Sequence, residues 1–189
     1  MTNFNRRSLI AGAGTALLLP ATAKASQGLY LYDALGRVVG AIYGNGAAVI
    51  YSYDAAGNRT VKAGPRITSD GFDPNYYLVA NPDIYYANVD PYTHYMNTGW
   101  HEGRDPSAYF STSGYLNAYS DIRNAGINPL THYSTSGWHE GRDPSTLFST
   151  LVYLQTYGDV AAAGINPYNH FLANGIYEGR QPCGTGSFH

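Results

Sequence analysis

The sequence predicts an α+β protein in which a small four-stranded antiparallel β-meander precedes a three-repeat helical-hairpin α-solenoid. Two internal repeats of different length support this fold class. Between residues 30 and 59 a tyrosine-rich motif recurs after 21 positions, with the alternation and turn residues typical of strands. Between residues 72 and 182 a longer motif recurs every 38 positions, with apolar residues at helical spacing. The low charge, 13% of 189 residues against 14% aromatic residues, excludes a disordered tail and a charged coiled coil.

Residues 1–25 have the charged start, apolar middle and small-residue cleavage site of a signal peptide. The apolar stretch from Ser8 to Leu19 is too short to span a bilayer, and Ala23-Lys24-Ala25 fits the cleavage site. The order Asn5-Arg6-Arg7-Ser8-Leu9-Ile10 resembles a twin-arginine export signal, with a general secretory signal as the alternative. We therefore expect an exported protein in the periplasm, at the cell surface or outside a Gram-negative bacterium, with no membrane span after cleavage.

Charge and cysteine content limit the classes of partner. The chain has 11 Lys and Arg against 13 Asp and Glu, and three of the basic residues but no acidic one fall within 1–25. The mature chain is therefore mildly acidic and has no basic face for phosphates, so we expect no nucleic-acid partner. The single cysteine, Cys183, cannot form an internal disulfide, and it is either a free thiol in the tail 183–189 or an intermolecular bridge.

The segment 26–63 is predicted to form the β-meander. The motif Tyr-x-Tyr-Asp-x-x-Gly starts at Tyr30 and again at Tyr51, and each Asp-x-x-Gly has the residue order of a type I turn. Between the two motifs, Asn45-Gly46 predicts a two-residue hairpin with a type I′ turn, in which both residues have positive φ. The two edge strands of such a sheet are templates for pairing, so we expect a homo-oligomer formed through the sheet edges.

Both motifs continue to an arginine, as Tyr-x-Tyr-Asp-x-x-Gly-Arg from Tyr30 and Tyr-x-Tyr-Asp-x-x-Gly-Asn-Arg from Tyr51. They resemble the YD repeats of RHS-type bacterial surface and secreted proteins. In that family many copies wind into a large β-shell that can enclose a toxic C-terminal segment. Two copies are too few to close a shell, so the resemblance implies a small sheet with exposed tyrosines and no encapsulation.

After a linker, 64–71, which is either rigid or flexible, three helical units are predicted at 72–109, 110–147 and 148–182. Twelve positions agree in all three copies, which indicates one structural unit used three times. In the middle copy, apolar spacing predicts a first helix near 112–125 that Gly126 ends. A second helix of about nine residues starts at an N-cap followed by proline and ends at glycine. The N-cap pairs are Asp90-Pro91, Asn128-Pro129 and Asn166-Pro167, and the glycines are Gly99, Gly137 and Gly175.

These units resemble short helical modules found in many bacterial secreted and surface proteins, some with calcium-binding tandem repeats. The resemblance is best at Asn81-Pro82-Asp83, whereas Tyr119-Ser120-Asp121 and Tyr157-Gly158-Asp159 keep only the acid. It implies location and architecture, and it implies no enzymatic role.

The polar residues that recur in every copy are predicted to be structural. They are Asp83, Asp121, Asp159, His94, His132, His170, Arg104, Arg142 and Arg180. Equivalent residues of stacked units should lie about 10 Å apart, too far to converge on one metal ion. We expect the histidine to bond the neighbouring backbone and the aspartate to pair with the arginine. No metal site or cofactor is predicted, with calcium as an alternative because Asp90, Glu102 and Asp105 stand near turns.

Aromatic residues that differ between copies, together with the two tryptophans, form the candidate binding surface. They are Trp100, Trp138, Tyr85, Tyr86, Tyr92 and Tyr109. The alternative for the tryptophans is that they hold loops onto the next unit. No nucleophile elbow, phosphate loop or paired-carboxylate motif is present, so we expect no enzyme.

The expected function is therefore that of an exported, non-catalytic structural or adhesive repeat protein, which associates with itself or with an envelope protein or glycan. A glycan- or peptide-binding module is one alternative, and a calcium-stabilised surface module is another.

Overall fold

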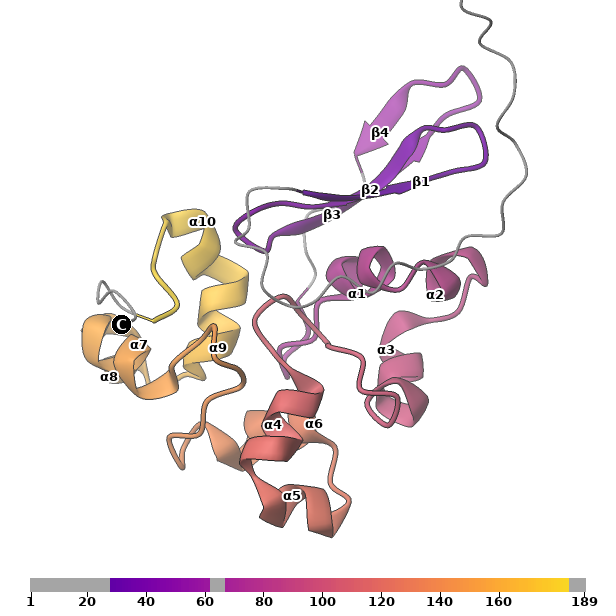
Figure 1. Cartoon of the computed structure of the whole chain (residues 1–189). Helices are drawn as coiled ribbons and strands as arrows, with labels where there is room; N and C mark the ends of the chain where they lie inside the picture. The colour runs from indigo at the N-terminus through magenta and orange to yellow at the C-terminus, as the bar shows by residue number, and fades with distance from the viewer. Residues whose placement is uncertain (1–27, 62–66, 184–189) are drawn as a thin grey trace, which may run out of the picture.

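The computed structural model describes residues 28–61 and 67–183, which form an antiparallel sheet and three helical units (Figure 1). The predicted signal peptide, residues 64–66 of the predicted linker and residues 184–189 of the tail lie outside the described residues. In the part of the chain that is described, none of the helices has the length and apolar character that crossing a membrane requires.

The sheet is the predicted four-stranded meander. Its strands are β1 (Leu29–Tyr32), β2 (Val38–Ile42), β3 (Ala48–Tyr53) and β4 (Arg59–Val61). They pair antiparallel in chain order, with Leu31 opposite Gly40 and Gly40 opposite Ile50. These three residues therefore share one face of the sheet.

The turn at Asn45-Gly46 differs from the predicted type I′ turn, because only Gly46 has a positive φ, at +80°. The N–H of Gly46 donates to the carbonyl of Tyr43 at 2.8 Å, and the N–H of Tyr43 donates to that of Ala47 at 2.8 Å. The turns that begin at Asp33 and Asp54 have the same pattern. The Asn45 side chain accepts a hydrogen bond from the N–H of Ala47 at 3.2 Å, which stabilises this longer hairpin loop.

Each helical unit contains two short α-helices and then a helix that becomes π-helical. The first unit has α1 (Pro74–Ala80), α2 (Pro82–Tyr86), α3 (Pro91–His94) and η1 (Tyr95–Gly99). The second has α4 (Thr112–Ala118), α5 (Ser120–Ala125), α6 (Pro129–His132) and η2 (Tyr133–Gly137). The third has α7 (Thr150–Thr156), α8 (Gly158–Ala163), α9 (Pro167–His170), η3 (Phe171–Gly175) and α10 (Ile176–Glu178).

The single helix predicted near 112–125 is two helices, α4 and α5, because Tyr119 between them is extended, with φ −118° and ψ 82°. This backbone directs the Tyr119 hydroxyl to the N–H of Asp143, which donates to it at 2.9 Å. In the first unit the break falls at Asn81, before Pro82, where proline disfavours a helical conformation. The end of the predicted helix at Gly126 is confirmed, with φ +64°.

The second helix of each unit starts at the predicted N-cap, and the π-helical turns of the first two units end at the predicted Gly99 and Gly137. In the third unit the predicted end at Gly175 is wrong, because the helical backbone continues through α10 to Gly179, which has φ +72°. Asn128 Oδ1 accepts hydrogen bonds from the N–H groups of Leu130 and Thr131, and η2 ends at Gly137. A Cβ atom placed on Gly137 would lie 2.5 Å from the hydroxyl of Tyr115. The glycine is therefore required at this position because a tyrosine of the preceding helix packs directly against the backbone.

The three units share one aromatic core and lie around a common centre in Figure 1. Its largest fully buried side chains include Phe72, Tyr77, Tyr95, Phe110, Tyr115, Tyr133, Phe148, Tyr153, Tyr168 and Phe171. Consecutive units stack, as predicted for a solenoid, and the third also returns to the beginning of the first. Asn169 Nδ2 donates to the carbonyl of Ser69, and the hydroxyls of Tyr168 and Ser107 are hydrogen-bonded. The row of units is therefore closed on itself.

The sheet is docked on the helical part by direct contacts. Val79 of α1 packs on β2 at Gly40. A Cβ atom placed on Gly40 would lie only 2.6 Å from a methyl group of Val79. Asn75 Nδ2 donates to the carbonyl of Ala48 at 3.3 Å, and Tyr109 donates to that of Asn45 at 2.9 Å. Figure 1 shows β2 and β3 next to α1.

Candidate binding site

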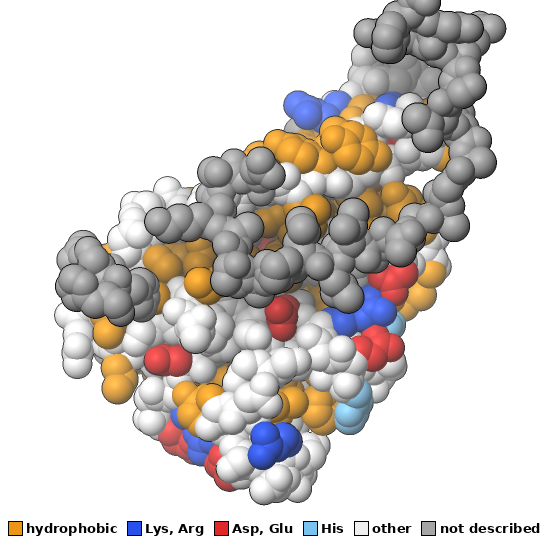
Figure 2. Space-filling view, in the orientation of Figure 1, with side chains coloured by type: hydrophobic (Ala, Val, Ile, Leu, Met, Phe, Trp, Pro, Cys, Tyr) orange, Lys and Arg blue, Asp and Glu red, His pale blue; other side chains and the backbone are white. Residues whose placement is uncertain are grey.

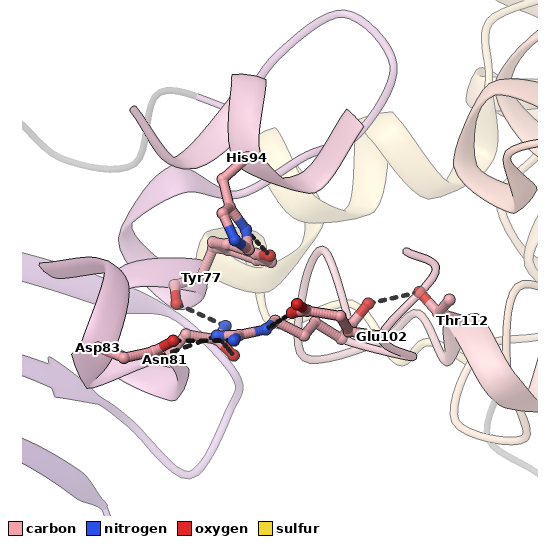
Figure 3. Close-up of polar contacts among 7 residues, drawn as sticks. Tyr77, Asn81, Asp83, His94, Glu102 and Thr112 are labelled. Carbon is pink, nitrogen blue, oxygen red and sulfur yellow. Dashed lines mark hydrogen bonds and ion pairs between the residues drawn. The ribbon is translucent and has the colours of Figure 1, made fainter. Parts of the chain in front are cut away.

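An arginine-centred cluster occurs in every unit, and Figure 3 shows the one in the first unit. In the first unit Arg104 donates from both terminal nitrogens to Asp83, at 2.9 and 2.8 Å, and from Nε to Glu102 at 2.6 Å. The other two clusters are Arg142 with Asp121 and Glu140, and Arg180 with Asp159 and Glu178. The predicted pairing of aspartate with arginine is therefore confirmed, and each pair lies within one unit.

The side chain beside the arginine differs between the units. The guanidinium of Arg142 lies 4.8 Å from the ring centroid of Tyr119, which adds a cation–π contact. In the first unit Asn81 takes this position and accepts a hydrogen bond from Arg104 at 3.1 Å. The hydrogen bonds from Arg142 lower the pKa of Asp121 to about 2. The aspartate stays ionised at neutral pH and is paired, so the cluster is suited to holding a loop.

The recurring histidine bonds a tyrosine hydroxyl, so the prediction that it bonds the backbone is wrong. His94 Nδ1 lies 2.9 Å from the hydroxyl of Tyr77 (Figure 3), and the other pairs are His132 with Tyr115 and His170 with Tyr153. The tyrosine ring is buried, and its hydroxyl needs a partner there. Burial raises the pKa of Tyr77 to about 12. In the second unit, burial and, to a smaller extent, the charge of Arg142 lower the pKa of His132.

Four of the six aromatic candidates pack against other side chains at separate places. Trp100 and Trp138 are half-buried against the aromatic core, and each ring lies 3.6 Å from that of the following histidine. Tyr92 packs edge-on against Phe72, and Tyr109 packs edge-on against Phe171. The sequence did not show these partners, because they come from other parts of the chain.

The remaining candidates, Tyr85 and Tyr86, line a groove of about 730 Å³ between the sheet and the first unit. Their rings meet edge to face at 5.4 Å. The sheet side is lined by Asp33, Arg37, Val39, Ile50, Tyr51, Ser52 and Tyr53, and the helical side also includes Leu78, Asn88, Val89, Asp90 and Pro91. The volume is in the usual range for ligand sites.

The sheet side of the groove is built by residues of the repeated tyrosine motif. Arg37 Nε donates to Asp33 Oδ2 at 2.7 Å, and the guanidinium lies 4.2 Å from the ring centroid of Tyr53. The hydrogen bond from the backbone N–H of Arg37 lowers the pKa of Asp33, and the hydrogen bond from the Arg37 side chain adds to this effect, whereas desolvation opposes it. The sequence placed Asp33 in a turn and Tyr53 in a strand and did not identify them as groove residues, although the arginine and tyrosine of the motif were the available signal.

The side chains that line the groove are of the kinds that bind a ligand. The groove combines tyrosine rings with a paired carboxylate and guanidinium, and Asp90 lies at its edge as the N-cap of α3. Among the residues that the structure describes, no group of three or more His, Cys, Asp or Glu side chains is placed to hold a metal ion.

The other notable surface is the outer edge of β1, which pairs with no strand among the described residues. Leu29, Tyr30 and Tyr32 on this strand are 51%, 50% and 48% exposed. Figure 2 shows hydrophobic side chains gathered where the sheet lies in Figure 1.

Comparison with known proteins supports the sheet. Residues 32–65 match the RHS Repeat family. This match covers β2, β3 and β4 and the turns that build one side of the groove, so the chain contains an RHS repeat followed by helical repeats. No curated protein and no solved structure matches the chain.

Proposed function

We propose that the chain is an exported, non-catalytic structural or adhesive repeat protein that associates with itself through the outer edge of β1. The carrying observation is the exposure of Leu29, Tyr30 and Tyr32 on a strand whose outer edge is unpaired among the described residues. An apolar strand edge favours pairing with another strand. Contacts with a cell-envelope protein or glycan would use the same edge.

The opposite edge of the sheet is less suited to pairing. Strand β4 has three residues and begins with Arg59, whose guanidinium lies 4.6 Å from the ring centroid of Tyr51. Short, charged edges disfavour strand addition. Two copies would therefore pair β1 with β1 around a twofold axis, which gives a closed dimer.

Export is part of the proposal and rests on the pattern of residues 1–25. Cleavage would leave residue 26 as the first residue of the mature chain, close to β1. Mass spectrometry of the protein recovered from periplasm and medium tests this, and an intact N-terminus in the cytoplasm would contradict it.

Light scattering over a range of concentrations tests the association. The mature chain should form dimers or larger species, and Tyr30→Lys should shift it to monomer because the edge then carries a charge. Tyr177→Lys is the matched control, since Tyr177 is 55% exposed on α10 and is not part of strand β1. A chain that is monomeric at every concentration, with no particles in electron micrographs, would overturn the proposal.

The groove favours a second candidate function, a glycan- or peptide-binding module. Its rings Tyr51, Tyr53, Tyr85 and Tyr86 can stack on sugars or apolar side chains. Titration with cell-wall and capsular glycans and with peptides, followed by NMR, should shift signals of groove residues. Tyr85→Ala should remove the effect and Tyr177→Ala should keep it, and no shift with any probe would remove this candidate.

A calcium-stabilised module remains as the third candidate and rests on the acidic composition of the mature chain. It requires a higher melting temperature in calcium than in chelator. Equal melting temperatures would remove it.

A further inference from the structure

The second helical unit contains a separate pocket of about 350 Å³, between α4 and the loop 143–146. Ser111, Gly114, Tyr119, Asp143 and Ser145 are among the residues that line it. The volume lies at the lower end of the range for ligand sites, which suits a single ring.

The first unit shows which group such a space accommodates. The residue 38 positions before Gly114 is Tyr76. Tyr76 is half-buried, and desolvation followed by the charges of Asp105 and Asp73 raises its pKa. Asp73 and Asp105 are the equivalents of Ser111 and Asp143, both of which line the pocket.

The local backbone is the same in the two units. The N-cap residues Asp73 and Ser111 have φ and ψ values of −107° and 100°, and of −114° and 107°. A side chain at position 114 would therefore leave its helix in the same direction as the side chain of Tyr76, so the ring of Tyr76 takes up in the first unit the space that Gly114 leaves open in the second. In the third unit Val152 and Gln181 replace Gly114 and Asp143, which leaves neither the open space nor the carboxylate.

We propose that this pocket binds the phenol ring of a tyrosine presented by a second copy of the chain, with the hydroxyl directed toward Asp143. That a second copy of the chain supplies this ring depends on the self-association proposed above. Outside the β1 edge, the chain supplies a suitable ring in Tyr43, which is 44% exposed. A ring of one copy in a pocket of the next is a head-to-tail contact, which would link dimers into longer assemblies.

The binding chemistry is tested with N-acetyl-tyrosinamide as the probe, titrated into the mature chain and followed by NMR. Signals of Gly114 and Asp143 should shift, and N-acetyl-phenylalaninamide should bind about tenfold more weakly because it lacks the hydroxyl. Absence of shifts with the tyrosine probe would overturn the proposal that the pocket binds a phenol ring. Equal affinities for the tyrosine and phenylalanine probes would overturn the role of Asp143.

Gly114→Tyr should abolish probe binding, because the chain then fills its own pocket as the first unit does. A Cβ atom at this position would lie 2.9 Å from Ser111 Oγ, so the double variant Ser111→Asp/Gly114→Tyr reproduces the residue pair of the first unit in case the single variant folds poorly. Val152→Tyr is the matched control, since it adds the same ring to the third unit and should leave binding unchanged. Probe binding that persists in the folded double variant would overturn the proposal.

The source of the ring is tested by the size of the assemblies. Light scattering of the Gly114→Tyr variant should show dimers in place of longer assemblies. The Tyr30→Lys variant should still bind the tyrosine probe. Assemblies of unchanged size would overturn the second copy as the source. Probe binding by a chain that never associates would overturn the proposed self-association and leave only the pocket chemistry standing.

Discussion

At the residue scale, three tyrosines of the core are held by a glycine and a histidine. The hydroxyls of Tyr77, Tyr115 and Tyr153 lie against the backbone of a glycine at the end of each π-helical turn. The same hydroxyls are hydrogen-bonded to histidine Nδ1. Glycine is required there by the close approach of a ring, and the sequence repeat alone did not show this reason.

Gly137→Ala should lower the free energy of unfolding by about 1–3 kcal/mol, because the added methyl group collides with the Tyr115 hydroxyl. Chemical denaturation followed by circular dichroism measures the change. Gly158→Ala is the control, since a Cβ atom there meets no other atom within 4 Å. Equal effects of the two substitutions would contradict the packing explanation.

Two buried carboxylates give the stability a dependence on pH. Burial raises the pKa of Asp73 and of Asp105 to about 6. The folded state then binds more protons than the unfolded state between pH 4 and 6, so these groups make the protein less stable as the pH rises through this window. The lowered pKa of His132 and His170 acts in the opposite sense below pH 6.5.

Asp73→Asn and Asp105→Asn should therefore each stabilise the protein at pH 7.5, by on the order of 2 kcal/mol, with little effect at pH 4.5. Asparagine is also a good N-cap, so the first substitution keeps the start of α1. Melting temperatures of wild type and variants at both pH values give the comparison. A gain at pH 4.5 as large as that at pH 7.5 would show that the carboxylates are not the cause.

At the element scale, consecutive units are joined by a tyrosine and a threonine. The hydroxyl of Tyr133 is 2.8 Å from Thr150 Oγ1, and Thr150 donates to the carbonyl of Arg142 at 2.6 Å. Tyr95 and Thr112 form the same contact between the first two units. The third unit has Phe171 in place of the tyrosine, and no further unit follows it among the described residues.

Tyr133→Phe should lower the free energy of unfolding by about 1 kcal/mol, because a buried hydrogen bond at the junction is lost. A double-mutant cycle with Thr150→Val should give a coupling energy of at least 0.5 kcal/mol. Additive effects of the two substitutions would show that the hydroxyls do not act as a pair.

At the scale of the whole molecule, the third unit closes on the beginning of the first through Tyr168. This residue is fully buried and packs edge-on against Tyr133 and Phe148, whereas its equivalent in the first unit, Tyr92, is 36% exposed. The two equivalent side chains therefore contribute unequally to the free energy of unfolding, because Tyr168 faces the centre of the ring of units and Tyr92 faces its margin.

Tyr168→Ala should cost about 3–5 kcal/mol and Tyr92→Ala about 1 kcal/mol, in proportion to the ring surface that each buries. Chemical denaturation measures both. Wild type should unfold in a single transition, because the closing contacts couple the units. Equal costs for the two substitutions would indicate an open row of units in solution.

The sequence determined the elements that depend on local chemistry. Strand alternation and turn residues predicted the meander, and the Asp-Pro and Asn-Pro pairs predicted the start of the second helices, because caps and turns depend on neighbouring residues. The 38-residue period predicted the stacking of units. The aspartate–arginine pair was also predictable, since both residues recur together and opposite charges attract.

Which surfaces remain available for binding depends on how the units pack together. Tyr92 and Tyr109, which were binding candidates by sequence, pack against Phe72 and Phe171. Arg37 and Tyr53 of the repeated tyrosine motif line the groove. The break at Tyr119, the bond from histidine to tyrosine and the open space at Gly114 depend on residues distant in the chain. Local propensity carries no information about such partners, because they meet only when the units close around their common core.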